Sequence, residues 1–482
     1  MKNVLFAASE SFPFIKTGGL ADVVGTLPKR FNKSEFDVRV VIPNYTCIPA
    51  EFRDKFEYVH HFYMDLGDNI LNAHVGIMTY VYDGITFYFI DNEHYFAGQM
   101  PYGRMLFDIE KFSFFSKAVL AILPVINFKP DIIHCHDWQT GLIPVFLKTL
   151  YKDNPFFQEI RTIMTIHNLK FQGIWDIKTI KGITGLPEYL FTPDKLEYKK
   201  DANMLKGGLV YADYITTVSN TYADEIQTAY YGEGLDGLLR ARHQSLCGIV
   251  NGIDYDIYNP NTDTDIYEKY NVKNFRKKKA LNKRALQEEL GLPVDDNKYM
   301  LGIISRLTDQ KGLDLINWVM EGIVDPNVQF VIIGTGEQKY EDMFKYYEWI
   351  LKDRVSANIF YSDNRAHKLY AAADALLMPS RFEPCGLAQL MALRYGTIPI
   401  VRETGGLKDT VESYNEYTNT GTGFSFANYN ADEMLHIINY SKHIYYDCRK
   451  DWNKMVERGM KMDFSWERSA KKYEEVYRLL TE

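Results

Sequence analysis

The chain has 482 residues, of which 46% are hydrophobic and 24% are charged, and its formal net charge is -8. This length exceeds what one hydrophobic core supports, so two domains are expected. The acidic balance argues against a nucleic acid as partner, because phosphate binding requires a basic face.

Cysteine usage and apolar segments indicate the compartment. The five cysteines are odd in number and include no C-x-x-C pair, which favours a reducing compartment and no structural zinc. The apolar start at 4–8 is too short for a signal peptide, and no segment approaches the ~18 apolar residues of a membrane span. We therefore expect a soluble, cytoplasmic protein with no membrane partner.

Apolar segments alternate with segments of helical spacing along the chain, which is typical of α/β proteins. In the first half, strands are predicted at 4–8, 38–43, 73–78, 86–90, 131–138, 160–166 and 215–218, and a helix at 112–125. After a crossing near 248–260 comes a strongly charged segment, 263–298, which a solvated helical face explains better than a binding role. In the second half, strands are predicted at 300–305, 328–333, 371–378 and 398–401, and helices from 313, at 386–393 and at 470–480.

Two loops share the pattern Thr-Gly-Gly-Leu-x-Asp, at 17–22 and at 404–409. Each follows a predicted strand, where glycines let the backbone approach a ligand, and Lys16 adds a charge that can meet phosphate. A plain turn is the alternative for such a loop. The G-x-G-x-x-G fingerprint of dinucleotide binding is missing, which argues against a nicotinamide dehydrogenase. The repetition suggests two related α/β units.

The segment 380–387 joins a predicted strand to a predicted helix and contains Glu383. In an open α/β sheet ligands bind at this position, because helix amides point outward there. A turn whose Glu383 only caps the helix is the alternative.

Arg306 and Lys311 lie on one predicted strand-to-helix loop, and their spacing lets both point at one anion. With the two Gly-Gly loops they describe a diphosphate site that needs no metal, because fixed cations and amides can stabilise a departing phosphate. A salt-bridged surface loop is the alternative. Two D-x-D strings, at 254–256 and 263–265, fall in the predicted linker, and neither is interpreted as a metal site.

Two predicted strands end in histidine with a neighbouring Asp or Asn, at His136-Asp137 and His167-Asn168. Metal binding would require three or four convergent ligands, and no H-x-x-x-H pattern occurs here. A single histidine at a strand end is more often structural, but two of them favour a pair that lines a cleft.

Five motifs occur together in one order: Lys16-Thr17-Gly18-Gly19-Leu20, His136-Asp137-Trp138, Val250-Asn251-Gly252-Ile253-Asp254, Ser305-Arg306-Leu307 with Gln310-Lys311-Gly312, and Arg381-Phe382-Glu383-Pro384-Cys385-Gly386. This combination closely resembles the bacterial glycogen synthases and plant starch synthases, a family of retaining glycosyltransferases. The resemblance covers essentially the whole chain.

The resemblance implies an α/β fold of the GT-B type, with two Rossmann-like domains facing a deep interdomain cleft. The implied domains are an N-terminal one at 1–248, a C-terminal nucleotide-sugar domain at 249–460, and a helix at 461–482 that crosses back to the first. The implied reaction transfers glucose from ADP-glucose to the non-reducing end of an α-1,4-glucan, glycogen, with retention and release of ADP. No metal and no cofactor are implied.

The resemblance also assigns roles to residues. Arg306 and Lys311 would hold the diphosphate with help from Lys16, Glu383 would bind the sugar hydroxyls, and His167 would lie against the glucose, where Asp137 supports the pocket. Tyr361 would stack on adenine. The remaining substrate-binding candidates are Gly18, Gly19, Asp22, Asn168, Asn251, Ser305, Cys385, Gly386, Leu387, Gly405 and Gly406.

Two positions depart from the family pattern. Met391 stands where many related transferases have a second Glu, which puts the ribose contact in doubt, and Gln139 stands where some relatives have His, which could alter acceptor contacts. One alternative is a two-domain transferase that uses UDP-glucose or makes a disaccharide. Another is an inactive glucan-binding protein, which would be expected to lose Arg306, Lys311 or Glu383, yet all three are present.

Overall fold

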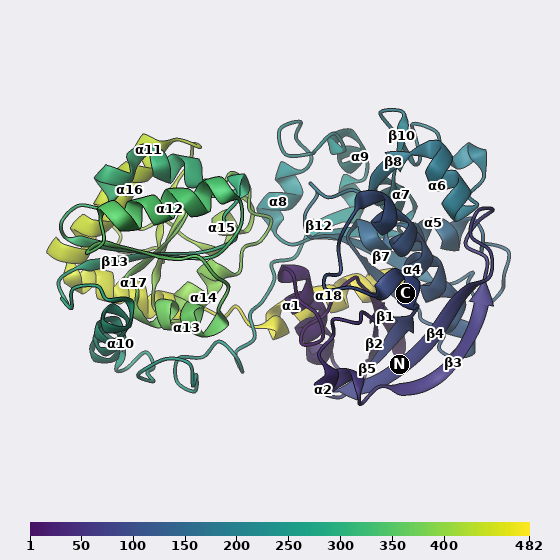
Figure 1. Cartoon of the computed structure of the whole chain (residues 1–482), viewed down its shortest axis with the longest axis horizontal. Helices are drawn as coiled ribbons and strands as arrows, with labels where there is room; N and C mark the ends of the chain where they lie inside the picture. Colours follow the sequence, from purple (N-terminus) through teal and green to yellow (C-terminus); the bar gives the residue numbers. More distant parts are fainter. The chain divides into compact units, whose positions relative to one another are not determined.

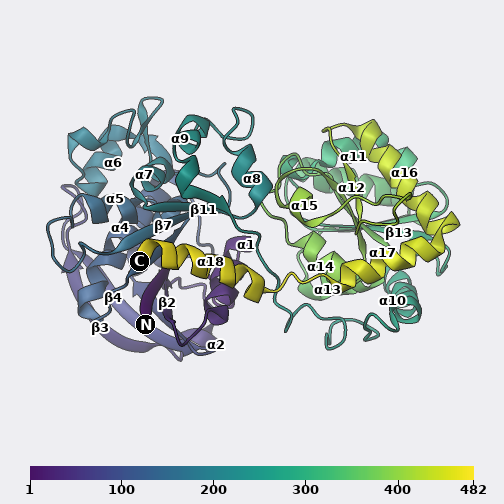
Figure 2. The same ribbon diagram turned by 180° about the vertical axis from the view of Figure 1, so that it is seen from behind.

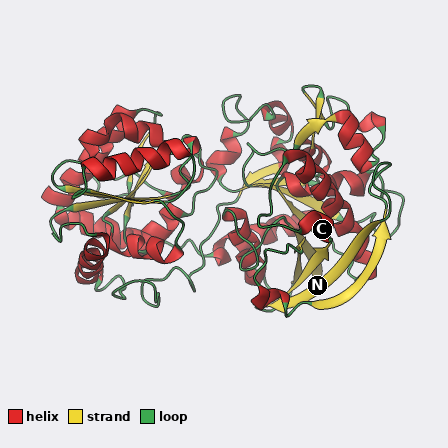
Figure 3. Cartoon of the chain, viewed as in Figure 1, coloured by secondary structure: helices red, strands yellow, loops and turns green.

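The computed structural model describes all 482 residues, and the chain divides into two compact units. Unit 1 comprises Met1–Val218, Ala223–Ile249 and Trp466–Glu482, and unit 2 comprises Ser219–Tyr222 and Val250–Ser465. In each unit, helices surround a central sheet (Figure 3). None of the helices is both long and apolar enough to cross a membrane.

Unit 1 is built on a nine-stranded sheet with the order β12-β11-β7-β6-β1-β2-β5-β4-β3. Its strands are β1 (Lys2–Ala7), β2 (Phe36–Pro43), β3 (Glu57–Met64), β4 (Ala73–Tyr82), β5 (Ile85–Asp91), β6 (Ile132–His136), β7 (Arg161–Ile166), β11 (Tyr214–Thr217) and β12 (Leu246–Gly248). The strands pair in parallel except at the β3–β4–β5 edge. The central strands are apolar on both faces because helices cover both. β3 escaped prediction, since most of its side chains are exposed and polar or aromatic.

The helices of unit 1 include one that is longer than the sequence predicts. Helix α4 begins at Met105 rather than at Phe112, because the exposed apolar residues of its first turn hide the helical spacing. The others are α1 (Gly19–Thr26), α2 (Ala50–Arg53), α3 (Glu93–Phe96), α5 (Leu142–Lys148), α6 (Ile177–Thr184), α7 (Met204–Tyr211) and α9 (Asp236–Ala241), while α8 (Asn220–Glu225) begins in the short segment of unit 2. A small sheet is formed by β8 (Ile174–Asp176), β9 (Glu197–Tyr198) and β10 (Asp201–Asn203).

The C-terminal helix α18 (Trp466–Thr481) belongs to unit 1 (Figure 2), where it contacts the short 3-10 helix Leu27–Arg30 that follows α1. The fully buried Tyr477 stacks on Phe31 with ring centroids 5.3 Å apart, and its hydroxyl is 2.8 Å from Nδ1 of His134. Arg478 donates to Glu35 at 2.8 Å. The apolar stripe on this helix is therefore buried against the segment that leads into β2 and against strand β6.

Unit 2 has a six-stranded parallel sheet with the order β15-β14-β13-β16-β17-β18. Its strands are β13 (Tyr299–Ile304), β14 (Val328–Ile333), β15 (Val355–Asn358), β16 (Ala375–Met378), β17 (Ile398–Arg402) and β18 (Phe424–Phe426). Helices α11 (Leu313–Ile323), α12 (Gln338–Ile350) and α16 (Ala431–Asp447) cover one face, and α10 (Phe275–Leu290), α13 (Asp363–Ala372), α14 (Ala388–Arg394) and α17 (Arg449–Lys461) lie on the other (Figure 1). Helix α15 (Gly405–Thr410) follows β17.

Two sequence predictions for unit 2 need correction. The segment 371–378, predicted as a strand with its approach, forms a strand only from Ala375, because its first residues finish helix α13. The charged segment 263–298 does contain the exposed helix α10, but Lys283 on that helix is only 3% exposed. Charge alone could not show that one side of this helix points into the protein.

Candidate functional site

In unit 1 the sheet brings three predicted groups to one edge. Strand β6 pairs in parallel with both β1 and β7, so the carboxyl ends of these three strands are neighbours. The loop with Lys16 follows β1, Asp137 follows β6, and His167 follows β7. This is the edge at which ligands bind in open α/β sheets.

Asp137 organises this edge through its backbone and its carboxylate. Its φ of +56° lies in the left-handed region, which a residue without glycine's freedom adopts only when its surroundings hold it there. Its Oδ1 accepts hydrogen bonds from the backbone N–H of His167 at 2.7 Å and of Asn168 at 3.4 Å. Burial raises the pKa of Asp137 to about 7, and Glu10 acts in the same direction. Asp137 therefore supports the loop that presents His167.

His167 is the end of a chain of three histidines. Its Nε2 is 2.9 Å from Nδ1 of His136, whose ring stacks on that of His134 with centroids 4.3 Å apart. Burial lowers the pKa of His167 to about 3, and it also lowers the pKa of His136 well below its ordinary value. His167 is consequently a neutral imidazole, which can exchange hydrogen bonds with a sugar hydroxyl but supplies no charge.

Glu10 is a site residue that sequence reasoning missed. Its side chain is 3% exposed, and its Oε2 accepts a hydrogen bond from the backbone N–H of Thr17 at 2.5 Å. Burial raises the pKa of Glu10 to about 7. The sequence signal that could have identified Glu10 is a carboxylate shortly after a buried strand, where packing alone does not require a charge.

The first Gly-Gly loop is open to its surroundings. Lys16 is exposed, and its Nζ lies 2.8 Å from Oδ1 of Asp22. Gly18 precedes helix α1, no side chain caps that helix, and a Cβ added to Gly18 would meet no atom within 4 Å. Gly19 is the first residue of the helix. The loop thus leaves backbone and cation accessible together.

In unit 2 the same kind of edge collects the second set of candidates. Strand β16 pairs in parallel with β13 and with β17. The residues that follow these strands are Ser305, Arg306 and Lys311 after β13, the segment 380–387 after β16, and Gly405 and Gly406 after β17. The loops are joined directly, since the backbone N–H of Arg381 donates to the carbonyl of Gln310 at 2.9 Å.

Lys311 and Glu383 form the polar centre of this edge. The Lys311 Nζ lies 2.6 Å from Oε2 of Glu383, which also accepts from the Ser380 hydroxyl at 2.9 Å. Glu383 is only 6% exposed, whereas Arg306 is exposed and forms no ion pair. A buried carboxylate held by a lysine, beside an unpaired guanidinium, is suited to a polyhydroxylated ligand that carries phosphate.

Glycines allow the loops around Glu383 to touch. Gly405 has φ +45°, and a Cβ there would lie 1.9 Å from the carbonyl oxygen of Glu383. A Cβ on Gly406 would lie 2.1 Å from the carbonyl oxygen of Cys385, and one on Gly312 would lie 2.0 Å from that of Pro379. The second Gly-Gly loop therefore supports the Glu383 turn from behind.

Cys385 is buried in this turn as a neutral thiol. Burial raises its pKa to about 12, although a hydrogen bond with the backbone of Asn251 acts in the opposite direction. Oδ1 of Asn251 is buried without a hydrogen-bond partner. Gly386 has φ +69°, and Leu387 immediately precedes helix α14. Cys385 is thus a packing and backbone residue rather than a nucleophile.

Tyr361 does not join the other candidates of unit 2. It follows β15, which lies two strands away from β13 in the sheet. Its side chain is 71% exposed, and its hydroxyl donates to Asp363 at 2.7 Å. An exposed ring at a strand end is available for stacking, but the structure does not place it beside Glu383.

One cluster of metal-binding residue types lies away from these loops, at Asp263, Asp265 and His367, with ligand atoms within 4.8 Å of one another. Oδ2 of Asp263 is 2.6 Å from His367 Nδ1 and also accepts a hydrogen bond from Tyr395. The backbone N–H of Asp265 donates to Oδ1 of Asp263 at 2.8 Å. These contacts occupy both oxygens of Asp263, so the cluster is adequately explained as a hydrogen-bond network.

The chain matches two family models. The starch synthase catalytic domain matches residues 3–241, and the glycosyl transferases group 1 model matches residues 286–461. It is 64% identical over 480 residues to the glycogen synthase of Lachnospira eligens and 62% identical to that of Lachnoclostridium phytofermentans, with 100% of both chains covered in each case.

Two solved structures extend this comparison. The catalytic domain of starch synthase IV from Arabidopsis thaliana, bound to ADP and acarbose, matches with a TM-score of 0.91 and 33% identity, covering 100% of this chain and 99% of that one. The sucrose-phosphate synthase of Thermosynechococcus elongatus matches with a TM-score of 0.61 at 16% identity, over 100% and 99% of the two chains, and shows a similar fold alone. The predicted α/β fold of the GT-B type is confirmed.

Proposed function

The chain belongs to the glycogen and starch synthase family of glucosyltransferases, and on that premise we propose that it transfers glucose from ADP-glucose to an α-1,4-glucan. Members of this family transfer glucose from a nucleotide-sugar donor to a glucan acceptor and release the nucleoside diphosphate, so the reaction class follows from the relationship. The finer proposal is the identity of both substrates: ADP-glucose as donor, and the non-reducing end of glycogen as acceptor. The ADP bound to the related starch synthase structure supports the choice of nucleotide.

The observation that carries the proposal is the arrangement of Lys311, Glu383 and Arg306. The buried carboxylate of Glu383 can accept hydrogen bonds from glucose hydroxyls while Lys311, 2.6 Å away, remains close to the same ligand. Negative charge develops on the departing ADP, and the ammonium and the unpaired Arg306 guanidinium are cations able to stabilise it. We assign donor binding to these residues of unit 2.

In unit 1 we assign sugar and acceptor contacts to His167 and the residues that hold it. A neutral imidazole can hydrogen-bond a glucose hydroxyl without opposing the positive charge that develops on the sugar ring. Asp137 already accepts two backbone hydrogen bonds, which suits it to positioning rather than to nucleophilic attack. Retention therefore requires departure and attack on the same face of the sugar, without the carboxylate nucleophile that retaining glycosidases use.

The choice of donor is tested with the purified full-length protein. Radiolabelled ADP-glucose and UDP-glucose are compared at equal concentration with glycogen as acceptor, with and without a chelator. We expect label in glycogen mainly from ADP-glucose and no loss with the chelator. Faster incorporation from UDP-glucose, or label in a disaccharide, would contradict the substrate assignment, and loss of activity with the chelator would contradict a metal-free diphosphate site.

We place this reaction in the cytoplasm. All five cysteines are free, and none is paired with another, which fits a reducing compartment. Fractionation of source cells, with the activity followed in each fraction, tests this placement.

A further inference from the structure

Unit 2 contains a cavity of about 390 Å³ at the edge of its sheet that is opposite to the candidate site. Three residues that line it come just before strands, namely Asn297 before β13, Asp374 before β16 and Gly396 before β17. The donor-binding candidates follow the carboxyl ends of the same three strands. The cavity is therefore separate from the site described above, although both lie in one unit.

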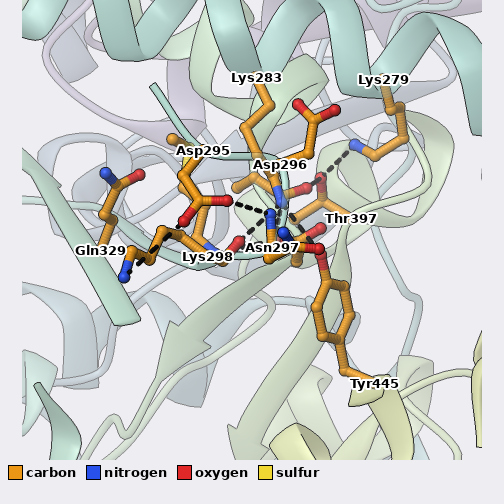
Figure 4. A network of polar contacts seen from close by, with 12 residues as sticks. Lys279, Lys283, Asp295, Asp296, Asn297, Lys298, Gln329, Thr397 and Tyr445 are labelled. Carbon is orange, nitrogen blue, oxygen red and sulfur yellow. Dashed lines mark hydrogen bonds and ion pairs between the residues drawn. The ribbon is translucent and has the colours of Figure 1, made fainter. Parts of the chain in front are cut away.

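The lining of the cavity carries more positive than negative charge. Its charged and aromatic members include Arg276, Lys279, Lys283, Asp374, Tyr445 and Arg449. The side chains of Lys279 and Lys283 both extend from helix α10, and the side chain of Tyr445 faces them from the opposite side (Figure 4). Asp296 is the other acid of the lining. The lining thus has four basic side chains and two carboxylates.

Both carboxylates are already neutralised. The Nζ of Lys283 lies 2.5 Å from Oδ2 of Asp374, which also accepts from the backbone N–H of Met300 at 2.8 Å. Asp296 accepts from Nε of Arg284 at 2.6 Å. Lys279, Arg276 and Arg449 form no ion pair with either of these carboxylates.

The hydrogen-bond partners of Lys279 are all neutral oxygens. Its Nζ lies 2.9 Å from the Thr397 hydroxyl and within 3.2 Å of three backbone carbonyls, those of Tyr370, Ala371 and Tyr395. Burial lowers the pKa of Lys279 to about 7, against the influence of Asp374. A bound anion would compensate this buried positive charge better than the carbonyls do.

Arg276 and Arg449 lie at the rim, where both are exposed and form no ion pair. The guanidinium carbon of Arg449 is 4.1 Å from the centroid of the Tyr445 ring, which holds its plane in place. Arg449 is also the first residue of the 13-residue helix α17, whose N-terminus has no side-chain cap. Its amide groups add positive potential at the same rim.

We propose that this cavity binds a small anion that carries a phosphate group. Two arginine forks and a helix N-terminus are the groups that recognise phosphate oxygens in proteins. The side chains of Asn297 and Asn453, also in the lining, offer amides to a hydroxylated body attached to the phosphate. The volume accommodates such a body, since water occupies only ~30 Å³.

The site is tested by isothermal titration calorimetry of the full-length protein with inorganic phosphate, in the presence of saturating ADP. The double variant Arg276→Gln/Arg449→Gln removes both rim cations. Its matched control is Lys277→Gln/Lys450→Gln, which removes the same charge from exposed neighbours outside the lining. We expect the wild type and the control to bind phosphate equally, and the double variant to bind about tenfold more weakly or worse.

Three results would overturn the proposal: no phosphate binding by the wild type, equal binding by the double variant, or an equal loss in the control. Binding that disappears in Lys311→Ala instead would place the anion at the donor site and would also overturn it. The same titration with a hexose monophosphate then shows whether the phosphate group comes from a sugar phosphate or from free phosphate. Tighter binding than inorganic phosphate identifies a sugar phosphate, and weaker binding identifies free phosphate, and either supports the site provided the double variant loses it.

Discussion

The two Thr-Gly-Gly-Leu loops have the same sequence pattern but use their glycines differently. In the first loop a Cβ on Gly18 would meet nothing within 4 Å, and the backbone is open before helix α1. In the second, a Cβ on Gly405 would lie 1.9 Å from the Glu383 carbonyl oxygen, and one on Gly406 would lie 2.1 Å from that of Cys385. The first loop presents its backbone, whereas the second supports another loop.

This difference shows that a repeated motif can have two structural roles and can be held in place in two ways. In unit 1 the glycine loop is anchored by a side chain, since Glu10 accepts from the backbone N–H of Thr17. In unit 2 it is anchored by backbone contacts, since Gly406 donates to the carbonyls of Glu383 and Pro384 at 3.1 and 3.2 Å. The anchor in unit 1 titrates and the anchor in unit 2 does not, so the two loops are expected to respond differently to substitution and to pH.

The largest expected effect comes from Lys311, the ion-pair partner of Glu383, whose turn the second loop supports. Lys311→Ala removes the ammonium 2.6 Å from Glu383, and we expect kcat to fall by a factor of about 100 to 1,000, as for the loss of one fixed donor at a developing anion. Steady-state kinetics with ADP-glucose measures this. Lys345→Ala, an exposed lysine on α12, is the control and should be unaffected. Near-normal turnover in Lys311→Ala would remove Lys311 from the catalytic machinery.

The second effect tests the glycines themselves. Gly405→Ala forces a Cβ against a backbone oxygen at a φ of +45°, so we expect a loss of about 3 kcal/mol or more in the free energy of unfolding. Gly18→Ala is the matched variant, and its unfolding free energy should change by no more than about 0.5 kcal/mol. Urea denaturation measures both. Equal destabilisation by the two substitutions would show that the loops do not differ as described.

The third effect is the pH dependence of the free energy of unfolding that Glu10, the side chain that anchors the first loop, produces. The pKa of Glu10 is raised from 4.5 to about 7 in the folded protein, so between these values the unfolded chain releases a proton that the folded chain keeps. The free energy of unfolding therefore falls as the pH rises through this window. Glu10→Gln lacks the share of this fall that Glu10 contributes, whereas the share of Asp137, whose pKa is also raised to about 7, remains. The stability of the variant relative to wild type should therefore increase by about 3 kcal/mol between pH 4 and pH 8.

Urea denaturation at several pH values checks this expectation, and the relative stability should level off above pH 7. Gly18→Ala serves as the control, because it leaves the carboxylate in place and should show the pH dependence of the wild type. A difference between Glu10→Gln and wild type that stays constant with pH would mean that Glu10 is ionised as easily in the folded protein as in the unfolded chain.

Much of the fold could be predicted because it depends on local patterns. Apolar segments such as 299–304 and 328–333 are strands because both faces of a parallel sheet are covered, and this leaves a mostly apolar segment in the sequence. β3 could not be predicted in this way, since it is an edge strand with mostly exposed side chains. The motifs likewise indicated the family, which full-length relatives confirm, while the individual roles of the site residues stay predictions.

By itself, the sequence determined the alternation of strands and helices, the strand ends at which polar residues collect, and the family. Only the tertiary structure decided that Lys311 pairs with Glu383, that Glu10 is buried, that Tyr361 is exposed away from Glu383, and that Lys279 and Lys283 on a charged helix line a cavity. The physical reason is the separation in sequence between the residues that determine each property. Secondary structure follows from neighbours a few positions apart, whereas a side chain's partner, burial and pKa depend on residues that the chain brings together from far away.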